Sequence, residues 1–143
     1  MPRPTIASRI PDSFTVGQRV SFTRTFTDGD MALFIGATWD INPYHTDDTF
    51  AATTRFQRRI VPGLLPGSMA THLGGLWGFL ATEMNMEFVA PVYVGDTITL
   101  EVEITAVEEP RGLVRAKCRW TNTEGVEVVR GGFAGYPARR KPA

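Results

Sequence analysis

The sequence predicts an α+β fold in which an antiparallel sheet of about five strands curves around one long helix. The stretch 60–82 contains no Asp, Glu, Lys or Arg, which is typical of a helix buried inside a fold. Two later stretches, 97–107 and 113–121, alternate apolar and polar residues, which is the pattern of half-buried strands. Because several interior glycines weaken the apolar helix, we expect the sheet to support it.

The chain is expected to begin with an arm, a strand and a helix. Residues 1–12 contain three prolines and should form a loose arm. Residues 18–26 alternate in the manner of a strand. Thr27 and Asp30 then have the spacing of a capping box. The residues that share one helical face after this box are Met31, Phe34, Ile35 and Thr38. We therefore expect a helix that leads the chain to residue 39.

The sequence WDINPYH, residues 39–45, is predicted to bend. Pro43 lacks an amide hydrogen and disfavours the helical conformation of Asn42. In a regular helix or strand, Asp40 and His45 would point in different directions because they are five residues apart. A bend can turn both side chains toward one point, as an acid and a base that share one water molecule require. The alternative is an ordinary Asn-Pro turn in which the two side chains have no common role.

A short helix and then the long apolar helix are predicted after the bend. Thr46 is the expected N-cap of the short helix, whose first turn contains Asp47 and Asp48. The buried helix is expected from Pro66 to Ala81, because proline suits the first helical turn. Its small residues, which recur every three or four positions, are Gly67, Ala70, Thr71, Gly74, Gly75 and Gly78. Two prolines and five glycines within 60–82 argue against a membrane span.

The second half of the chain is predicted to supply four antiparallel strands, at 84–94, 97–107, 113–121 and 127–136. Pro91 should bend the first of these strands or place it at a sheet edge. The EEPRG and NTEG sequences between the later strands are turn signals. Cys118 lies on the apolar face of its strand, so we expect a buried structural thiol.

Composition limits the functional classes. Fifteen basic and fifteen acidic residues give a formal charge of zero, which argues against nucleic acid or an anionic membrane as the main partner. Two histidines and one cysteine at scattered positions do not have the spacing of metal ligands. The lone cysteine and the lack of an apolar leader segment favour a cytoplasmic protein. The length favours a single domain over residues 1–143.

The chain resembles the MaoC-like dehydratase family, and within it the R-specific enoyl-CoA hydratases. The motifs that carry this resemblance are D-x-N-P-x-H-x-D at 40–47, FAATTRF at 50–56, RIVPG at 59–63 and VGDTITLEVEI at 94–104. The resemblance implies a hot-dog fold, in which a sheet wraps a central helix and an overhanging segment carries the active-site loop. It also implies a homodimer, and no cofactor apart from the coenzyme A that belongs to the substrate.

The resemblance assigns roles to individual residues. In the family, the residues that match Asp40 and His45 flank the water that adds across the double bond, and the match of Asn42 shapes the loop. Gly63 precedes the predicted long helix and is expected to offer a backbone amide to the thioester oxygen, although it can also be a plain turn residue before the helix. Thr71 aligns with a helix serine of the related hydratases, although its hydroxyl can equally bond its own backbone. The family often has a histidine where this chain has Pro62, so the contribution of that side chain is absent here.

The expected reaction is the reversible addition of water to a trans-2-enoyl thioester. We expect His45 to take the proton from water, and Asp40 to orient the water and return a proton to the α-carbon, although the two roles can be exchanged. An oxyanion donor such as Gly63 is needed as well, because acid-base catalysis contributes only about 10² to 10⁴ in rate. The alternatives are an acyl-CoA thioesterase of the same fold and a non-catalytic subunit that binds acyl thioesters.

The remaining candidate residues have open roles. Arg55, Arg58 and Arg59 can meet the phosphates of coenzyme A or form a solvated loop. His72 is expected to serve in packing or at a dimer contact. The aromatic residues that can shape an acyl tunnel, or belong simply to the core, are Trp39, Tyr44, Phe56 and Trp77.

Overall fold

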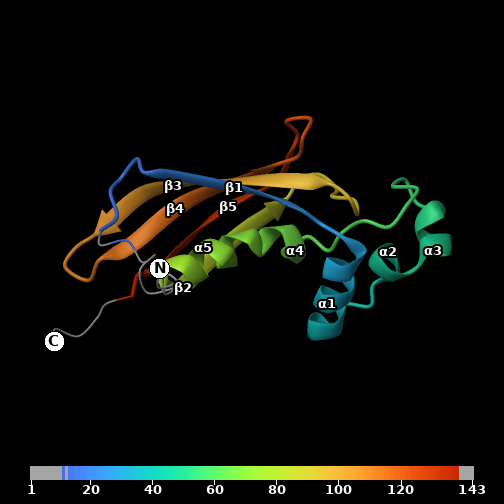
Figure 1. Cartoon of the computed structure of the whole chain (residues 1–143), viewed down its shortest axis with the longest axis horizontal. Helices are drawn as coiled ribbons and strands as arrows, with labels where there is room; N and C mark the ends of the chain where they lie inside the picture. The colour runs from blue at the N-terminus through green and yellow to red at the C-terminus, as the bar shows by residue number, and fades with distance from the viewer. Residues whose placement is uncertain (1–10, 12, 139–143) are drawn as a thin grey trace, which may run out of the picture.

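The computed structural model describes residues 11 and 13–138 and contains a five-stranded antiparallel sheet with a helix against one face (Figure 1). The strands are β1 (Arg19–Thr25), β2 (Leu80–Phe88), β3 (Thr97–Glu108), β4 (Leu113–Thr121) and β5 (Glu127–Tyr136). Their order across the sheet is β1-β3-β4-β5-β2. The α+β class with about five strands is therefore confirmed. The expected arm over residues 1–12 lies outside the described residues, apart from residue 11.

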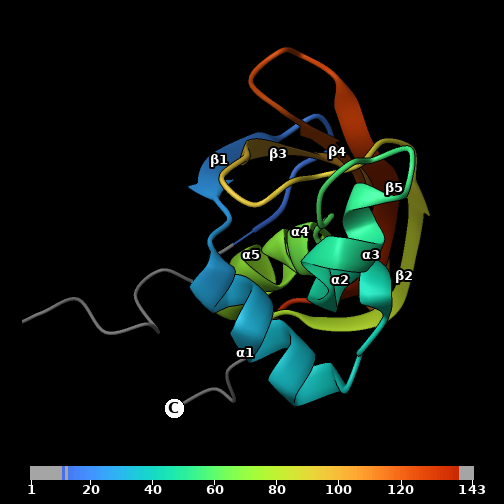
Figure 2. The same cartoon turned by 90° about the vertical axis from the view of Figure 1, so that its right-hand side faces the viewer.

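The helices divide into two groups. They are α1 (Asp28–Thr38), α2 (Pro43–Thr46), α3 (Asp48–Ala52), α4 (Leu64–Gly67) and α5 (Met69–Trp77). The α4 and α5 helices follow each other along one face of the sheet, whereas α1, α2 and α3 project beyond one end of it (Figures 1 and 2). We call the projecting segment, residues 28–60, the overhang. Among the described residues, no helix has the length and apolar character needed to cross a membrane.

The core lies between the sheet and the α4–α5 segment. Alternate residues of β3 and β4 point into it, as the sequence pattern predicts. The buried side chains of these two strands are Ile98, Leu100, Val102, Ile104, Val114, Ala116, Cys118 and Trp120. The helix contributes Met69, Leu73 and Trp77, which lie on one face at four-residue spacing. Burial of each large apolar side chain stabilises the fold by about 1.5 to 3 kcal/mol.

The long helix was predicted with the wrong ends. It begins at Leu64 rather than Pro66, and it ends at Trp77 rather than Ala81. Gly78 ends the helix in the left-handed conformation with a φ of 58°, which glycine adopts without a steric penalty. The strand β2 begins soon afterwards, at Leu80. The prediction included its first residues in the helix because a short apolar run suits a strand as well as a helix.

The strand predicted at 84–94 is also displaced. It occupies residues 80–88 and pairs with β5, while its other edge has no strand beside it within the described part of the sheet. Pro91 lies beyond the end of β2 and does not bend it, whereas the expected edge position of this strand is confirmed. The residues after Pro91 instead contact the segment before α4, where the Val61 amide donates to the Val92 carbonyl at 2.7 Å.

Two predicted helix starts have different outcomes. The capping box of α1 is confirmed, because the Asp30 amide donates to the Thr27 hydroxyl at 3.2 Å and the Thr27 amide donates to the Asp30 carboxylate at 2.9 Å. Thr46 was wrongly predicted as the cap of the next helix. Asp47 caps α3 by accepting from the Phe50 amide at 2.9 Å, since a carboxylate interacts more favourably with a helix N-terminus. Thr46 is instead the last residue of α2.

Candidate active site

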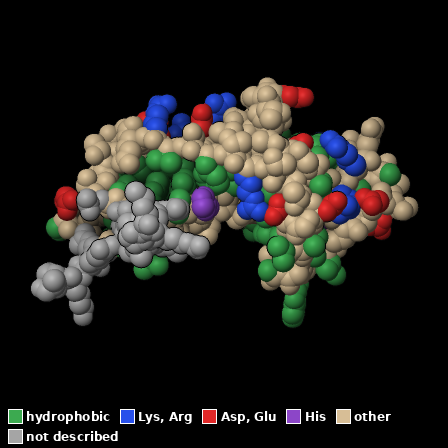
Figure 3. Space-filling model, in the orientation of Figure 1, with side chains coloured by type: hydrophobic (Ala, Val, Ile, Leu, Met, Phe, Trp, Pro, Cys, Tyr) green, Lys and Arg blue, Asp and Glu red, His purple; other side chains and the backbone are tan. Residues whose placement is uncertain are grey.

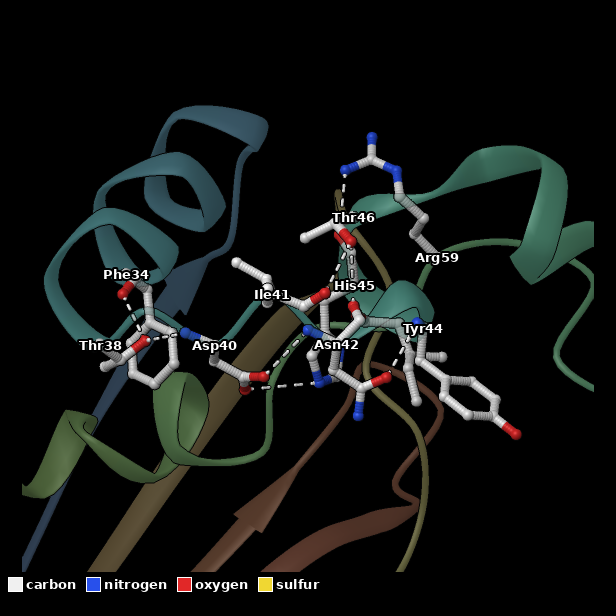
Figure 4. A network of polar contacts seen from close by, with 10 residues as sticks. Phe34, Thr38, Asp40, Ile41, Asn42, Tyr44, His45, Thr46 and Arg59 are labelled. Carbon is white, nitrogen blue, oxygen red and sulfur yellow. Dashed lines mark hydrogen bonds and ion pairs between the residues drawn. The ribbon is translucent and has the colours of Figure 1, made fainter.

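The bend over residues 39–45 brings Asp40 and His45 together on the overhang (Figure 4). Oδ2 of Asp40 lies 3.7 Å from Nε2 of His45. This separation is longer than a direct hydrogen bond, and a water molecule placed beside both atoms can bond each of them. The His45 side chain is 11% exposed, whereas the Asp40 side chain is 38% exposed. The imidazole is therefore enclosed by protein, and the carboxylate faces the space where a ligand can enter.

Local hydrogen bonds hold the Asp40 carboxylate in place. The helix α1 ends at Thr38, and its C-cap residue Trp39 adopts the left-handed conformation with a φ of 60°, an uncommon conformation for a bulky residue. The next amide, that of Asp40, donates to the Thr38 hydroxyl at 3.3 Å. One carboxylate oxygen of Asp40 accepts from the Asn42 amide at 3.3 Å, and the other faces His45. The turn thus fixes the backbone and the carboxylate together.

Asn42 and Pro43 hold the other half of the bend. The Asn42 side chain accepts from the Tyr44 amide at 3.1 Å and caps α2, and Pro43 occupies the first position of that helix. His45 is thereby carried on one turn of helix rather than on a free loop. Asn42 therefore shapes the loop through its side-chain oxygen.

The His45 ring has a defined tautomer. Its Nδ1 atom lies 2.8 Å from the carbonyl oxygen of Ile60. Because a carbonyl oxygen can only accept, Nδ1 carries the proton. In neutral His45 the lone pair therefore belongs to Nε2, the atom that faces Asp40. This is the form of the ring that can accept a proton at that position.

Asp40 and His45 line a cavity of about 390 Å³ between the overhang and the sheet, a size within the usual range of ligand pockets. Most of its remaining wall is apolar. The apolar side chains that line it include Phe34, Phe56, Val61, Phe88, Val92 and Val129. A small polar pair at the edge of an apolar cavity suits a ligand with a reactive polar group and a hydrocarbon chain.

Gly63 lies at the wall of the same cavity, directly before α4. Within the described part of the chain, its amide donates no hydrogen bond to another protein group. The ring of Phe88 lies against it so closely that a Cβ on residue 63 would be 2.5 Å from a ring carbon. The glycine thus combines a free amide with a close contact that a larger residue would disturb.

Arg55 and Arg58 lie over aromatic rings. Arg55 lines the cavity, and its guanidinium carbon is 4.7 Å from the centre of the Phe56 ring. The corresponding distance from Arg58 to the ring of Tyr93 is 4.0 Å. These stacked contacts orient both guanidinium groups and leave their N–H donors available for an anion.

Arg59 has different surroundings, because two carboxylates bind it. Its Nε donates to Asp48 at 2.6 Å and its Nη2 donates to Asp28 at 3.1 Å. The hydrogen bond that Arg59 donates to Asp48 is the main reason that the pKa of Arg59 is raised above its ordinary value. The structure therefore separates Arg59 from the two neighbouring arginines with which the sequence grouped it.

Several residues singled out in the sequence lie away from this cavity. Thr71 is exposed and lines a separate groove between α5 and β2. His72 packs on the ring of Phe22, with 5.0 Å between ring centres. Trp39 is 84% exposed, and Trp77 belongs to the buried core. Of the four aromatic residues considered for the tunnel, only Phe56 lines the cavity.

Sequence reasoning missed Phe34 and Phe88 as cavity residues. Phe34 comes from α1 and Phe88 from the end of β2, so no local pattern joins them to the bend. The position of Phe88 depends on where β2 ends. The prediction placed that end at residue 94, whereas β2 ends at Phe88. Among the described residues, no group of three or more His, Cys, Asp or Glu side chains is arranged to hold a metal ion.

Residues 13–125 match the model of the MaoC like domain family. The chain is 36% identical over 123 residues to an (R)-specific enoyl-CoA hydratase of Aeromonas caviae. The aligned region covers 83% of this chain and 92% of that protein. It is 31% identical over 107 residues to a mitochondrial 3-hydroxyacyl-[acyl-carrier-protein] dehydratase of Solanum lycopersicum, covering 71% of this chain and 63% of that protein.

The solved structure of the (R)-hydratase from A. caviae involved in PHA biosynthesis superposes with a TM-score of 0.84. The two chains share 33% sequence identity in this comparison. The superposition covers 90% of this chain and 100% of the other. The similarity therefore includes the sheet, the helix and the overhang together.

Proposed function

The chain belongs to the MaoC-like domain family and has the hot-dog fold, and from this premise we propose that it is an R-specific enoyl-CoA hydratase. Family membership makes it a hydratase or dehydratase of acyl thioesters. The reaction proposed is the reversible addition of water to a trans-2-enoyl-CoA, which gives an (R)-3-hydroxyacyl-CoA. The observation that carries the proposal is the Asp40–His45 pair, 3.7 Å apart at the edge of an apolar cavity.

The proposed mechanism places one water molecule between Oδ2 of Asp40 and Nε2 of His45. Nε2 accepts a proton from this water, and the water oxygen bonds to C3 of the substrate. The electron pair of the double bond moves onto the thioester oxygen, where the Gly63 amide stabilises the developing charge. The proton taken by His45 then reaches C2 through the Asp40 carboxyl group, and both side chains return to their starting states.

The magnitudes explain why the pair and the amide are proposed together. Acid-base catalysis contributes about 10² to 10⁴ in rate, and one oxyanion donor contributes about 10² to 10³. Their combined effect reaches about 10⁷ at most, while enzymatic accelerations begin near about 10⁶. Either contribution alone would be too small.

The cavity supports a division of the substrate into two parts. Its apolar wall suits the acyl chain, and the Arg55 and Arg58 donors suit the phosphates of coenzyme A. Arg59 is not proposed for this role, because Asp28 and Asp48 already bind its guanidinium. Coenzyme A rather than acyl carrier protein is therefore the proposed carrier.

Hydration of crotonyl-CoA tests the proposal. The Asp40→Ala and His45→Ala variants should each lose activity by a factor of about 10² to 10⁴ while remaining folded. His72→Gln is the matched control, since this histidine packs outside the cavity, and it should retain full activity. Loss of the conjugated thioester absorbance measures the rate, and chiral analysis of the product measures the configuration. Full activity in both alanine variants would contradict the assignment.

A second measurement separates hydration from thioester hydrolysis. A disulfide dye traps the free thiol that a thioesterase would release from acyl-CoA. We expect no thiol release during conversion of crotonyl-CoA. Release of thiol in step with substrate loss would replace the hydratase with the thioesterase alternative.

We also propose that the protein is a homodimer. Strand β2 is an edge strand, and its Leu80 and Met84 side chains are 75% and 46% exposed. Both line a groove of about 400 Å³ that also includes Thr71 of α5 and Phe133 of β5. A second copy that pairs its β2 against this edge would satisfy the free backbone groups and cover the groove.

A further inference from the structure

The Arg59 guanidinium joins three separate parts of the overhang. It bonds Asp28 at the start of α1 and Asp48 at the start of α3. Its Nη1 also donates to the carbonyl oxygen of His45 at 3.4 Å (Figure 4). The Arg59 side chain is 26% exposed, whereas the two carboxylate side chains are 72% and 83% exposed. We call this arrangement of Arg59, Asp28, Asp48 and the His45 carbonyl the Arg59 bridge.

The bridge lies next to the contacts that orient the His45 ring. The residue after Arg59 is Ile60, whose carbonyl accepts the Nδ1 proton of His45 at 2.8 Å. The amide of Ile60 donates to the carbonyl of Tyr44 at 3.0 Å. Residues 59–60 thus run beside residues 44–45 and contact His45 through both a side chain and a backbone carbonyl. A displacement of Arg59 would move the group that determines the tautomer of the ring.

The geometry requires a guanidinium rather than any positive charge. Three different N–H groups of Arg59 reach three acceptors in different directions, and a planar guanidinium presents such donors in a fixed arrangement. A lysine ammonium is a single compact donor on a flexible chain and cannot reproduce these directions. Two carboxylates around one guanidinium also leave little free positive charge for a substrate phosphate. The bridge is therefore better suited to hold the protein than to bind a ligand.

We propose that Arg59 is a positioning residue for His45, and that the Arg59 bridge holds the 59–60 segment so that the Ile60 carbonyl keeps the proton of the imidazole on Nδ1. The effect on catalysis rests on the proposed hydratase function. Without the bridge, the segment shifts relative to α2, and the ring populates the tautomer that protonates Nε2. In that tautomer Nε2 has no lone pair for the water proton. Substrate contacts in the cavity are unchanged, so turnover falls while binding is retained.

Steady-state kinetics of Arg59→Gln with crotonyl-CoA test the catalytic part. We expect kcat to fall by about 10- to 100-fold, in line with the effect of small misplacements of catalytic groups, and KM to stay within about threefold. Arg59→Lys should be impaired to a similar degree. The matched control is Arg115→Gln, because Arg115 likewise joins two carboxylates, Glu83 and Glu108, but does so on the sheet. The control should keep both constants.

Nitrogen-15 NMR of the imidazole tests the positioning part without any substrate. The chain has two histidines, so a His72→Gln background leaves the His45 signals alone. In its neutral form, the wild-type ring should show a protonated Nδ1 and an unprotonated Nε2. Arg59→Gln should shift both signals toward a mixture of tautomers, and Arg115→Gln should not. This measurement remains decisive if the wild-type protein proves to have a different activity.

Three outcomes would overturn the proposal. They are unchanged kcat and tautomer in Arg59→Gln, full recovery of both in Arg59→Lys, and a change confined to KM, which would assign Arg59 to substrate binding. If Arg59→Gln fails to fold, Asp48→Asn decides, because it removes the 2.6 Å ion pair and keeps the guanidinium. We expect Asp48→Asn to lower kcat and shift the tautomer in the same direction by a smaller amount, and the absence of both effects would contradict the bridge.

Discussion

The chemistry of single residues at the cavity depends on backbone groups as much as on side chains. The Ile60 carbonyl decides which nitrogen of His45 has a lone pair. The Asn42 amide holds one oxygen of Asp40, which leaves the other oxygen directed at the imidazole. The amide of Gly63 has no acceptor among the described residues and can donate to a ligand. Substitutions that leave the side chains of the proposed catalytic pair intact can therefore still change the proposed reaction.

Gly63 and Phe88 should be coupled in stability. Gly63→Ala places a methyl group into the Phe88 ring and should destabilise the protein by about 1 to 3 kcal/mol. Phe88→Ala removes the ring, so the double variant should be less destabilised than the sum of the two single variants. Unfolding in urea measures each free energy. Additive losses would show that the cost of Gly63→Ala does not come from its contact with the Phe88 ring.

Cys118 should be chemically inert in the folded protein. It is 1% exposed, and burial raises the pKa of its thiol to about 12. A disulfide reagent at neutral pH should modify it only after denaturant is added. Rapid modification of the native protein would contradict its burial.

The same thiol predicts a dependence of stability on alkaline pH. The pKa of Cys118 in the unfolded chain is about 8.5, below its value in the folded protein. As the pH rises through this interval, the unfolded state loses the proton first, so the free energy of unfolding falls by up to about 1.4 kcal/mol per pH unit. The Cys118→Ala variant should show a smaller slope between about pH 9 and pH 11. Equal slopes would contradict the prediction.

At the scale of elements, the start of α1 holds the overhang near the sheet. Thr27→Ala removes the hydroxyl of the capping box and should lower the free energy of unfolding by about 1 kcal/mol. Thermal unfolding measures this change. Because α1 leads directly to Asp40, the variant also tests whether helix stability and turnover are linked.

Asp30 in the same capping box predicts a loss of stability in acid. Hydrogen bonds from the Thr27 amide and then the Thr27 hydroxyl, followed by the charge of Arg24, lower the pKa of Asp30 below its ordinary value. The ionised Asp30 carboxylate therefore stabilises the protein fully at pH values above about 3.9, the pKa of aspartate in the unfolded chain. This stabilisation is lost as the pH falls further and the carboxylate of the folded protein is protonated. Asp30→Asn should show a weaker decline in melting temperature below about pH 4 than the wild type. The same decline in both proteins would assign the acid sensitivity to other carboxylates.

At the scale of the whole molecule, two areas of exposed apolar surface in the described part of the chain bear on assembly. One is the groove between α5 and β2, and the other is the overhang, where apolar side chains gather at the projecting end (Figure 3). The large apolar side chains exposed on the overhang are Leu33, Trp39, Ile41 and Phe50. Apolar areas of this kind commonly mark an interface, which is consistent with the proposed homodimer.

The edge of β2 provides the test of the proposed dimer. Met84→Lys places a charge in the groove and should convert the dimer to monomer at micromolar concentration. Val126→Lys is the control, because Val126 is similarly exposed but lies in the turn between β4 and β5. Sedimentation velocity measures the mass. A monomeric wild-type protein, or a dimeric Met84→Lys variant, would contradict the β2 interface.

Local patterns in the amino-acid order were sufficient for the regular parts of this protein. The alternation along residues 97–107 and 113–121 predicted β3 and β4, since a strand with one buried face requires it. The Thr27 and Asp30 spacing predicted the start of α1. The bend at Asn42 and Pro43 followed from restrictions on the backbone. Each of these features depends on residues within a few positions of one another.

Features that join distant segments could not be obtained in this way. The end of the long helix depends on whether residues 79–82 continue the helix or form a strand that pairs with β5. The apolar sequence of this run permits both, and the structure has the strand. The closeness of Phe88 to Gly63, and the separation of Arg59 from Arg55 and Arg58, arise only when the folded chain brings these segments together. Tertiary packing decides such contacts because their energies depend on geometry between elements, which no local spacing encodes.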